Sequence, residues 1–282
     1  MNRFSSISNS KILTTSSIKY LECKPLLVAL YTAFKFMTCL TFTTSSNIEN
    51  ENLIGSMHVF PLIGLVIGSI GAIFYFISSL LLPSTISTIF AITVIIVITK
   101  ARHENEFAHI VNEVCNNSSI FNKKKPTNKD HRNNNYYGII ALILCLLLKF
   151  FVIIILSTPS AISRVLIITN VISISSIPLT MQLLSIFHIR MKSEFLTENI
   201  NMPSSRIVGI GTTIALIIAT IITTSGITFV ASIVTILAVI AMIYIVLYRI
   251  DKSIMTFKVE LLCISEQIAE ISTLLSVITF HL

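Results

Sequence analysis

The sequence predicts an all-α, polytopic transmembrane helical bundle, and three observations support that class. Of the 282 residues, 54% are hydrophobic and only 12% are charged, whereas soluble domains average roughly a quarter charged residues. The mean hydropathy is +0.86. Apolar stretches long enough to cross a bilayer recur along the chain, and many Lys and Arg residues lie in some of the segments between them. We therefore expect about six full spans, plus an interfacial N-terminal helix and an apolar C-terminal helix.

The N-terminal segment differs in character from the rest of the chain. Residues 1–25 are rich in Ser, Thr and Lys and contain no long apolar core, so we expect a polar cytoplasmic tail rather than a cleaved signal peptide. The apolar run over 26–42 is at most one membrane thickness long and is interrupted by Lys35, which favours an interfacial or re-entrant helix. Residues 26–282 are expected to form a single integral membrane domain.

The first full span is expected over 58–82, with Pro61 in its opening turn, where a missing N–H costs least. Small residues on one face of this helix would let another backbone approach closely. These residues are Gly64, Gly68 and Gly71. A tight turn then leads into a shorter apolar run over 84–99, which delivers the chain to a polar segment.

The second half of the chain contains the remaining apolar stretches. Four further spans are expected over 137–157, 161–187 (kinked at Pro178), 207–225 and 228–248. A last apolar helix over 254–280 carries Glu260, Glu266 and Glu270. Acidic groups at membrane depth are costly unless they face a polar interior or water.

Two basic residues fall inside or at the edge of these spans. Either could pair with a buried acid such as Glu260, Glu266 or Glu270, or snorkel to an interface, and Lys149, which lies nearer mid-span, is the better functional candidate. Arg164, near a helix end, is expected to snorkel to the interface.

The distribution of Lys and Arg predicts the orientation. The segments around 100–136, 188–206 and 249–258 hold seven, three and three of these residues, whereas the short turns at 82–84, 158–160 and 226–227 hold none. By the positive-inside rule, the charged segments and the N-terminal tail face the cytoplasm. We therefore expect a multi-pass protein of the bacterial inner membrane.

The polar segment over 99–138 is the expected site of function. It holds seven of the twenty Lys and Arg residues and three of the six histidines. It directly follows one span and directly precedes another, so we expect a cytoplasmic, active-site-like loop that folds against the spans. The basic charge of the chain lies in short connections between apolar spans, which indicates membrane orientation and contact with membrane lipid, and no nucleic-acid partner. The five cysteines lack CxxC spacing and are interpreted as apolar fillers.

Four blocks of the sequence carry a family resemblance. The stretch FPLIGLVIG at 60–68 resembles the FPLVGLLIG block of bacterial cobalamin synthase, adenosylcobinamide-GDP ribazoletransferase. Upstream, FMTCL at 36–40 is similar to that family's FLTRLP, with Cys39 in place of its Arg. Downstream, 99–113 is similar to TGGLHxDGLADTADG, and 129–142 is similar to KDSRIGTYGVIAL with one extra residue. The order of the four blocks is that of the family.

The resemblance implies a membrane transferase that joins alpha-ribazole to adenosylcobinamide-GDP, releases GMP and uses Mg²⁺. Several family residues remain in register or nearly so, namely His103, Glu104, Lys129, Asp130, Arg132, Tyr137 and Gly138. By this resemblance, His103, Glu104 and Asp130 are the expected catalytic residues. Lys129 and Arg132 are the expected phosphate contacts.

The departures from the family pattern concern its acids. The three family aspartates are replaced by Asn105, His109 and Asn112, which share one face if this segment is helical. Glu106 and Glu113 stand at two glycine positions. The family's C-terminal TGD appears as Thr256-Phe257-Lys258.

The loss of these acids leaves three hypotheses open. Magnesium typically takes one or two carboxylates together with substrate phosphates and water, and the carboxylates still present here are Glu104, Glu106, Glu113 and Asp130. The first hypothesis is that these acids hold the metal, with His103 and His109 as an alternative pair for a softer ion. The second is a catalytically decayed family member that acts as a membrane scaffold or binding protein. A transporter is the third, and it rests on Lys149 and the C-terminal acids without any repeated half-sequence.

Overall fold

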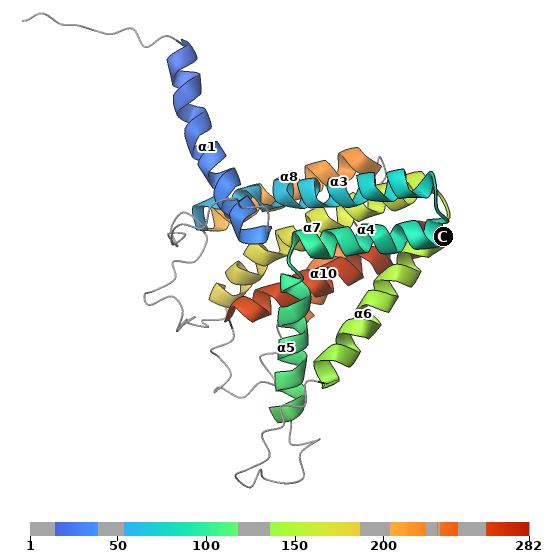
Figure 1. Ribbon diagram of the computed structural model, residues 1–282. Coiled ribbons are helices and arrows are strands. Elements are labelled where there is room, and N and C mark those ends of the chain that lie inside the picture. Colours follow the sequence, from blue (N-terminus) through green and yellow to red (C-terminus); the bar gives the residue numbers. More distant parts are fainter. Residues whose placement is uncertain are drawn as a thin grey trace, which may run out of the picture.

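The described part of the chain is entirely helical (Figure 1). The structure, a computed structural model, describes residues 15–38, 54–117, 136–186, 204–223, 230, 232–241 and 258–281. Its labelled elements are α1 (Thr15–Met37), η1 (Met57–Val59), α3 (Phe60–Ser79), α4 (Ser84–Ile98), α5 (Arg102–Asn117), α6 (Tyr136–Ile155), α7 (Pro159–Ile186), α8 (Ser205–Thr223) and α10 (Lys258–His281).

Five helices in the described residues are long and apolar enough to cross a membrane. They are Ile54–Ser79, Tyr136–Ile155, Pro159–Leu183, Ser205–Ile222 and Leu262–Thr279. Helix α4 together with the first part of α5 forms a bent pair that can count as a sixth. The predicted polytopic helical bundle is therefore confirmed.

The boundaries agree with the predicted spans at most places and differ at the chain's two ends. Helix α1 begins at Thr15, within the segment expected to be a polar tail, because Ser, Lys, Leu and Glu there are compatible with a helix. The C-terminal helix is long enough to span. The expected span over 228–248 is described mainly over Ser232–Ala241, and the rest of it lies outside the described residues.

Helix α7 lies at the centre of the bundle, in contact with α3, α8 and α10 (Figure 1). The predicted glycine face of α3 explains its close approach to α7. A Cβ atom on Gly64 would lie 2.5 Å from the Asn170 carbonyl oxygen, and one on Gly68 would lie 2.7 Å from the Ile167 Cα. Any side chain at these positions would push the two helices apart. Gly71 instead faces α4, where Ile95 occupies the space beside it.

The turn between α4 and α5 redirects the chain by 84°. Lys100 and Ala101 have φ angles of 58° and 52°. The Ala101 N–H donates to the Ile96 carbonyl at 2.8 Å, and the Lys100 N–H donates to the Val97 carbonyl at 3.1 Å. This pair of bonds is a Schellman motif, with Lys100 in the left-handed position that usually holds glycine. The turn ends the apolar α4 and starts the polar α5 at one end of the bundle.

Candidate active site at the turn between α4 and α5

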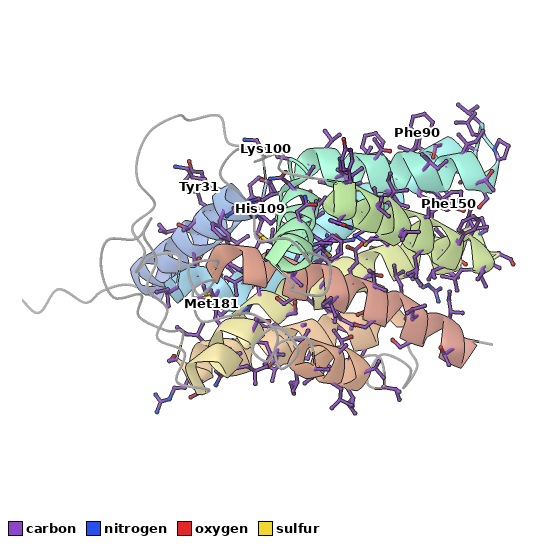
Figure 2. All side chains as sticks on the ribbon, turned by 90° about the horizontal axis from the view of Figure 1, so that it is seen from below. Tyr31, Phe90, Lys100, His109, Phe150 and Met181 are labelled. Carbon is purple, nitrogen blue, oxygen red and sulfur yellow. The ribbon has the colours of Figure 1, made fainter. Side chains whose placement is uncertain are left out.

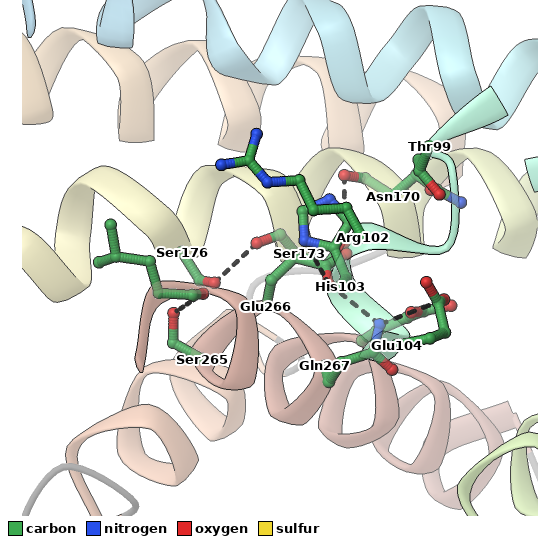
Figure 3. A network of polar contacts seen from close by, with 12 residues as sticks. Thr99, Arg102, His103, Glu104, Asn170, Ser173, Ser176, Ser265, Glu266 and Gln267 are labelled. Carbon is green, nitrogen blue, oxygen red and sulfur yellow. Dashed lines mark hydrogen bonds and ion pairs between the residues drawn. The ribbon is translucent and has the colours of Figure 1, made fainter. Parts of the chain in front are cut away.

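A cluster of buried polar side chains lies inside the bundle just beyond this turn (Figure 3). Helix α5 contributes His103 and Glu104, α6 contributes Lys149, and α10 contributes the remainder. The α10 members are Glu266, Gln267 and Glu270. Because the first turn of α5 packs against α10, the polar residues that follow the turn are carried into the bundle rather than into solvent.

Gln267 joins the members of this cluster. Its amide nitrogen Nε2 donates to Glu104 Oε1 at 3.4 Å and to Glu266 Oε2 at 3.2 Å. Its oxygen Oε1 accepts from Lys149 Nζ at 2.7 Å. Gln267 is 1% exposed, and its amide supplies a buried hydrogen bond to each of three charged groups.

Lys149 has an acidic partner, which is the first of the two alternatives that the sequence left open. Its Nζ lies 2.5 Å from Glu270 Oε2. On the opposite side of the cluster, His103 Nδ1 lies 3.5 Å from Glu266 Oε2. Arg164, in contrast, is exposed, and its place at the membrane interface stays a prediction.

The cluster surrounds a small cavity of about 20 Å³, which is room for one water molecule. Its polar lining comes from Thr99, His103, Glu104, Lys149, Asn170, Glu266 and Glu270. Two buried atoms in this lining, His103 Nδ1 and Glu104 Oε2, make no hydrogen bond. The polar lining therefore has hydrogen-bonding capacity for one small polar guest.

A larger, open groove of about 380 Å³ lies on the outer side of the same turn. Its lining from the end of α1 is Lys35, Phe36, Met37 and Thr38, and its lining from the turn and α5 is Thr99, Lys100, Arg102, Asn105 and Glu106. Figure 2 shows Lys100 at the same end of the bundle as Tyr31 of α1, away from Phe90 and Phe150. Two segments that are distant in sequence thus line one groove.

Arg102 connects these two segments. Its Nη1 donates to the Phe36 carbonyl oxygen at 2.9 Å, which supplies a partner to a carbonyl in the last turn of α1. Its guanidinium carbon lies 4.4 Å from the centre of the Phe36 ring, as in a cation–π contact. The orientation of Arg102 in the groove is therefore set by α1.

The structure separates the expected metal ligands that it describes. Glu104 lines the buried cavity, whereas Glu106 lines the open groove. The side chain of Glu113 and all of Asp130 lie outside the described residues. Across the described part of the chain, no group of three or more His, Cys, Asp or Glu residues could hold a metal ion. The expected phosphate contacts Lys129 and Arg132 also lie outside it.

The three positions of the family aspartates have different surroundings. Asn105 lines the groove, and His109 is exposed on α5. The Asn112 Oδ1 accepts a hydrogen bond of 2.7 Å from the Gly138 N–H in the first turn of α6. Asn112 therefore caps the neighbouring helix and joins the two ends of the polar segment.

Sequence reasoning missed two residues that organise the site. Gln267 lies between Glu266 and Glu270, the two acids noted in the sequence of the C-terminal helix. A further polar residue beside Glu266 on an apolar helix was the signal that could have identified it. Arg102 stands directly before His103, and in the sequence it is only one of the basic residues that predict membrane orientation. In the structure its guanidinium donates to the Phe36 carbonyl oxygen of α1.

These features define a polytopic helical membrane protein in which a buried ionic cluster and an open basic groove share one helix turn. The family model described as cobalamin-5-phosphate synthase matches residues 29–278. The chain therefore belongs to this family, and its place in cobalamin synthesis agrees with the resemblance carried by the four sequence blocks. No curated protein and no solved structure gives a significant match.

Proposed function

We propose that this protein is the membrane transferase that joins alpha-ribazole to adenosylcobinamide-GDP and releases GMP. The groove carries the proposal, because two family-like blocks separated in sequence line it together, the first over 36–38 and the second over 99–106. Its volume of about 380 Å³ falls within the range of roughly 300–1,000 Å³ that is usual for small-molecule sites. Membership of the family supports a role in cobalamin synthesis, and the groove is the proposed location of the reaction.

The proposed roles of the residues follow from their positions. His103 and Glu104 begin α5 beside the groove and belong to the buried cluster, so we propose that they hold the catalytic end of α5 in place. Asp130 is the proposed catalytic acid, with Lys129 and Arg132 as phosphate contacts; their segment follows α5 and leads into α6. The proposed magnesium ligands are Asp130 with Glu104, Glu106 or Glu113, but Glu104 lines the buried cavity and Glu106 is the one carboxyl group among the described residues of the groove, so the described residues do not form a magnesium site.

The proposed location of the groove is the cytoplasmic face of the inner membrane. This proposal is supported by the many Lys and Arg residues in the polar segments that connect the spans, because such residues favour the cytoplasmic side of a membrane. A cytoplasmic opening would give direct access to a nucleotide-linked substrate. Membrane lipid is the other proposed partner.

The test is formation of the cobalamin product from the two substrates in membranes that contain the protein. Asp130→Ala should abolish turnover, whereas Asn128→Ala, a matched change two residues away, should leave it intact. Restoring the family acids with Asn105→Asp, His109→Asp and Asn112→Asp should raise magnesium-dependent activity. Full activity that is indifferent to Asp130→Ala and to the three Glu→Ala changes would contradict the carboxylate assignment.

A second candidate function is a catalytically decayed scaffold. The observation that favours it is the replacement of all three family aspartates, by Asn105, His109 and Asn112. For this candidate we expect a folded protein that makes no product, even after the three aspartates are restored.

A further inference from the structure

The groove at the turn between α4 and α5 carries the wrong charge for a magnesium site. Three cationic side chains line it, namely Lys35, Lys100 and Arg102, against the single carboxyl group of Glu106. Magnesium is bound through carboxylate and phosphate oxygens, and neighbouring positive charges oppose the approach of a divalent cation. The described residues of the groove therefore do not fit the ion that the family resemblance implies.

The departures from the family motif make the groove more positive on balance. Asn105 lines the groove at the position of the first family aspartate. Lys100 stands at a glycine position of the motif, and Arg102 stands at a leucine position. The acid lost at 105 is offset by Glu106, which stands at a glycine position and also lines the groove, so the net change on this surface is a gain of two cations. The resulting surface favours an anion.

The backbone at Lys100 is strained. Its φ of 58° places it in the left-handed region, where a residue with a Cβ atom is less stable than glycine by about 1–2 kcal/mol. Its side chain is exposed and lines the groove. Strained backbone of this kind concentrates at functional sites, where the side chain is needed. Ala101, with a φ of 52°, shares this strain, so the placement of the Lys100 ammonium group at the groove, rather than the strain itself, indicates its role.

Arg102 is already held in position before a ligand arrives. Its contacts with the Phe36 carbonyl and ring fix the guanidinium at the edge of the groove. One N–H donor serves Phe36, and a guanidinium has five. The groove also lies at the N-terminus of the 16-residue helix α5, whose dipole favours negative charge. Both features lower the cost of binding an anion.

We propose that this groove binds the phosphate groups of its ligand directly through Lys100 and Arg102, without a divalent cation. The proposal rests on the proposed function, in which the ligand group is the diphosphate of adenosylcobinamide-GDP. The headgroup of an anionic phospholipid offers the same chemistry, and the experiment below distinguishes the two sources.

The first measurement is calorimetric binding of GDP and of inorganic pyrophosphate to the full-length protein in phosphatidylcholine nanodiscs with EDTA. We expect binding that persists in EDTA and weakens as the salt concentration rises. Binding that requires Mg²⁺ would overturn the proposal. Loss of GDP binding in nanodiscs that contain phosphatidylglycerol, at a salt concentration that screens the charge of the membrane surface, would show that the lipid headgroup is the ligand and would overturn the assignment to the substrate.

Variants at the turn separate charge from backbone effects. Lys100→Gly removes the ammonium and relieves the strained φ, so we expect about tenfold weaker GDP binding from a protein that remains folded. Lys100→Arg should retain the affinity. Ala101→Gly is the matched control, because it relaxes the same turn without a change of charge and should bind GDP as the native protein does. Native affinity in Lys100→Gly would overturn the proposal.

Product formation in the same samples separates this inference from the proposed function. If product forms only with magnesium and GDP binding also requires magnesium, the result would support the proposed transferase activity and overturn the proposal that the groove binds phosphate without a divalent cation. GDP binding in EDTA without product under any condition would support the groove and overturn the transferase.

Discussion

Lys149 of α6 and Glu270 of α10 form an ion pair inside the helical bundle, with 2.5 Å between Nζ and Oε2. Lys149 is 3% exposed and also donates to Gln267. A buried charge that loses its partner is costly. We therefore expect Lys149→Met to lower the free energy of unfolding by about 3–5 kcal/mol, measured by denaturant unfolding of the purified protein in detergent.

The control for this prediction removes both charges. Lys149→Met combined with Glu270→Leu leaves no unpaired charge at this contact, so the double variant should recover much of the stability lost in the single variant. A single variant as stable as the native protein would contradict the ion pair.

The contact between α3 and α7 provides the second prediction. A Cβ at Gly64 would lie 2.5 Å from the Asn170 carbonyl oxygen, so Gly64→Ala forces two helix backbones apart. We expect a loss of about 1–3 kcal/mol, measured as a lower thermal midpoint in detergent. Gly209→Ala in α8 is the matched control, because nothing lies within 4 Å of its Cβ position and alanine is the better helix former. Equal midpoints for the two variants would show that α3 and α7 are not in close contact at Gly64.

Much of the fold follows from the sequence because bilayer thickness sets the length of each apolar run. The glycine face of α3 is a clear case, since its spacing predicts a close helix contact and Gly64 and Gly68 make one with α7. The N-terminal boundary was less predictable. Residues from Thr15 onward are polar but helix-compatible, and composition alone does not show where such a helix begins.

The candidate site was predictable only in part, because its contacts are distant in sequence. The motif placed His103 and Glu104 at the site, and hydropathy singled out Lys149. The bond from Gln267 to Glu104 joins residues 163 positions apart, and that from Arg102 to Phe36 joins residues 66 positions apart. Neither pattern nor spacing specifies such pairs; they depend on how α1, α5 and α10 pack.

The cap of α6 provides the third prediction. The Asn112 side chain accepts from the Gly138 N–H at 2.7 Å, and loss of such a cap typically costs about 0.5–2 kcal/mol. Asn112→Ala should therefore lower the thermal midpoint, whereas Asn112→Asp should preserve it, because a carboxylate also accepts this bond and suits a helix N-terminus. Asn105→Ala, on the same helix but in the groove, should leave the midpoint unchanged. A midpoint unaffected by Asn112→Ala would leave this position free for another role.

The last prediction concerns orientation. The positive-inside rule places the polar segments that contain Ile120 and Phe195 in the cytoplasm. The turn between α3 and α4 would then face the outside, and Leu81 in this turn is 86% exposed. In a background without the five native cysteines, a membrane-impermeant maleimide added to intact cells should label Leu81→Cys and fail to label Ile120→Cys or Phe195→Cys. Both latter variants should react once the cells are opened, which shows that their thiols are accessible. Labelling of Ile120→Cys in intact cells would place the basic groove outside the cytoplasm, where a cytoplasmic nucleotide-linked substrate could not reach it, and would count against the proposed transferase.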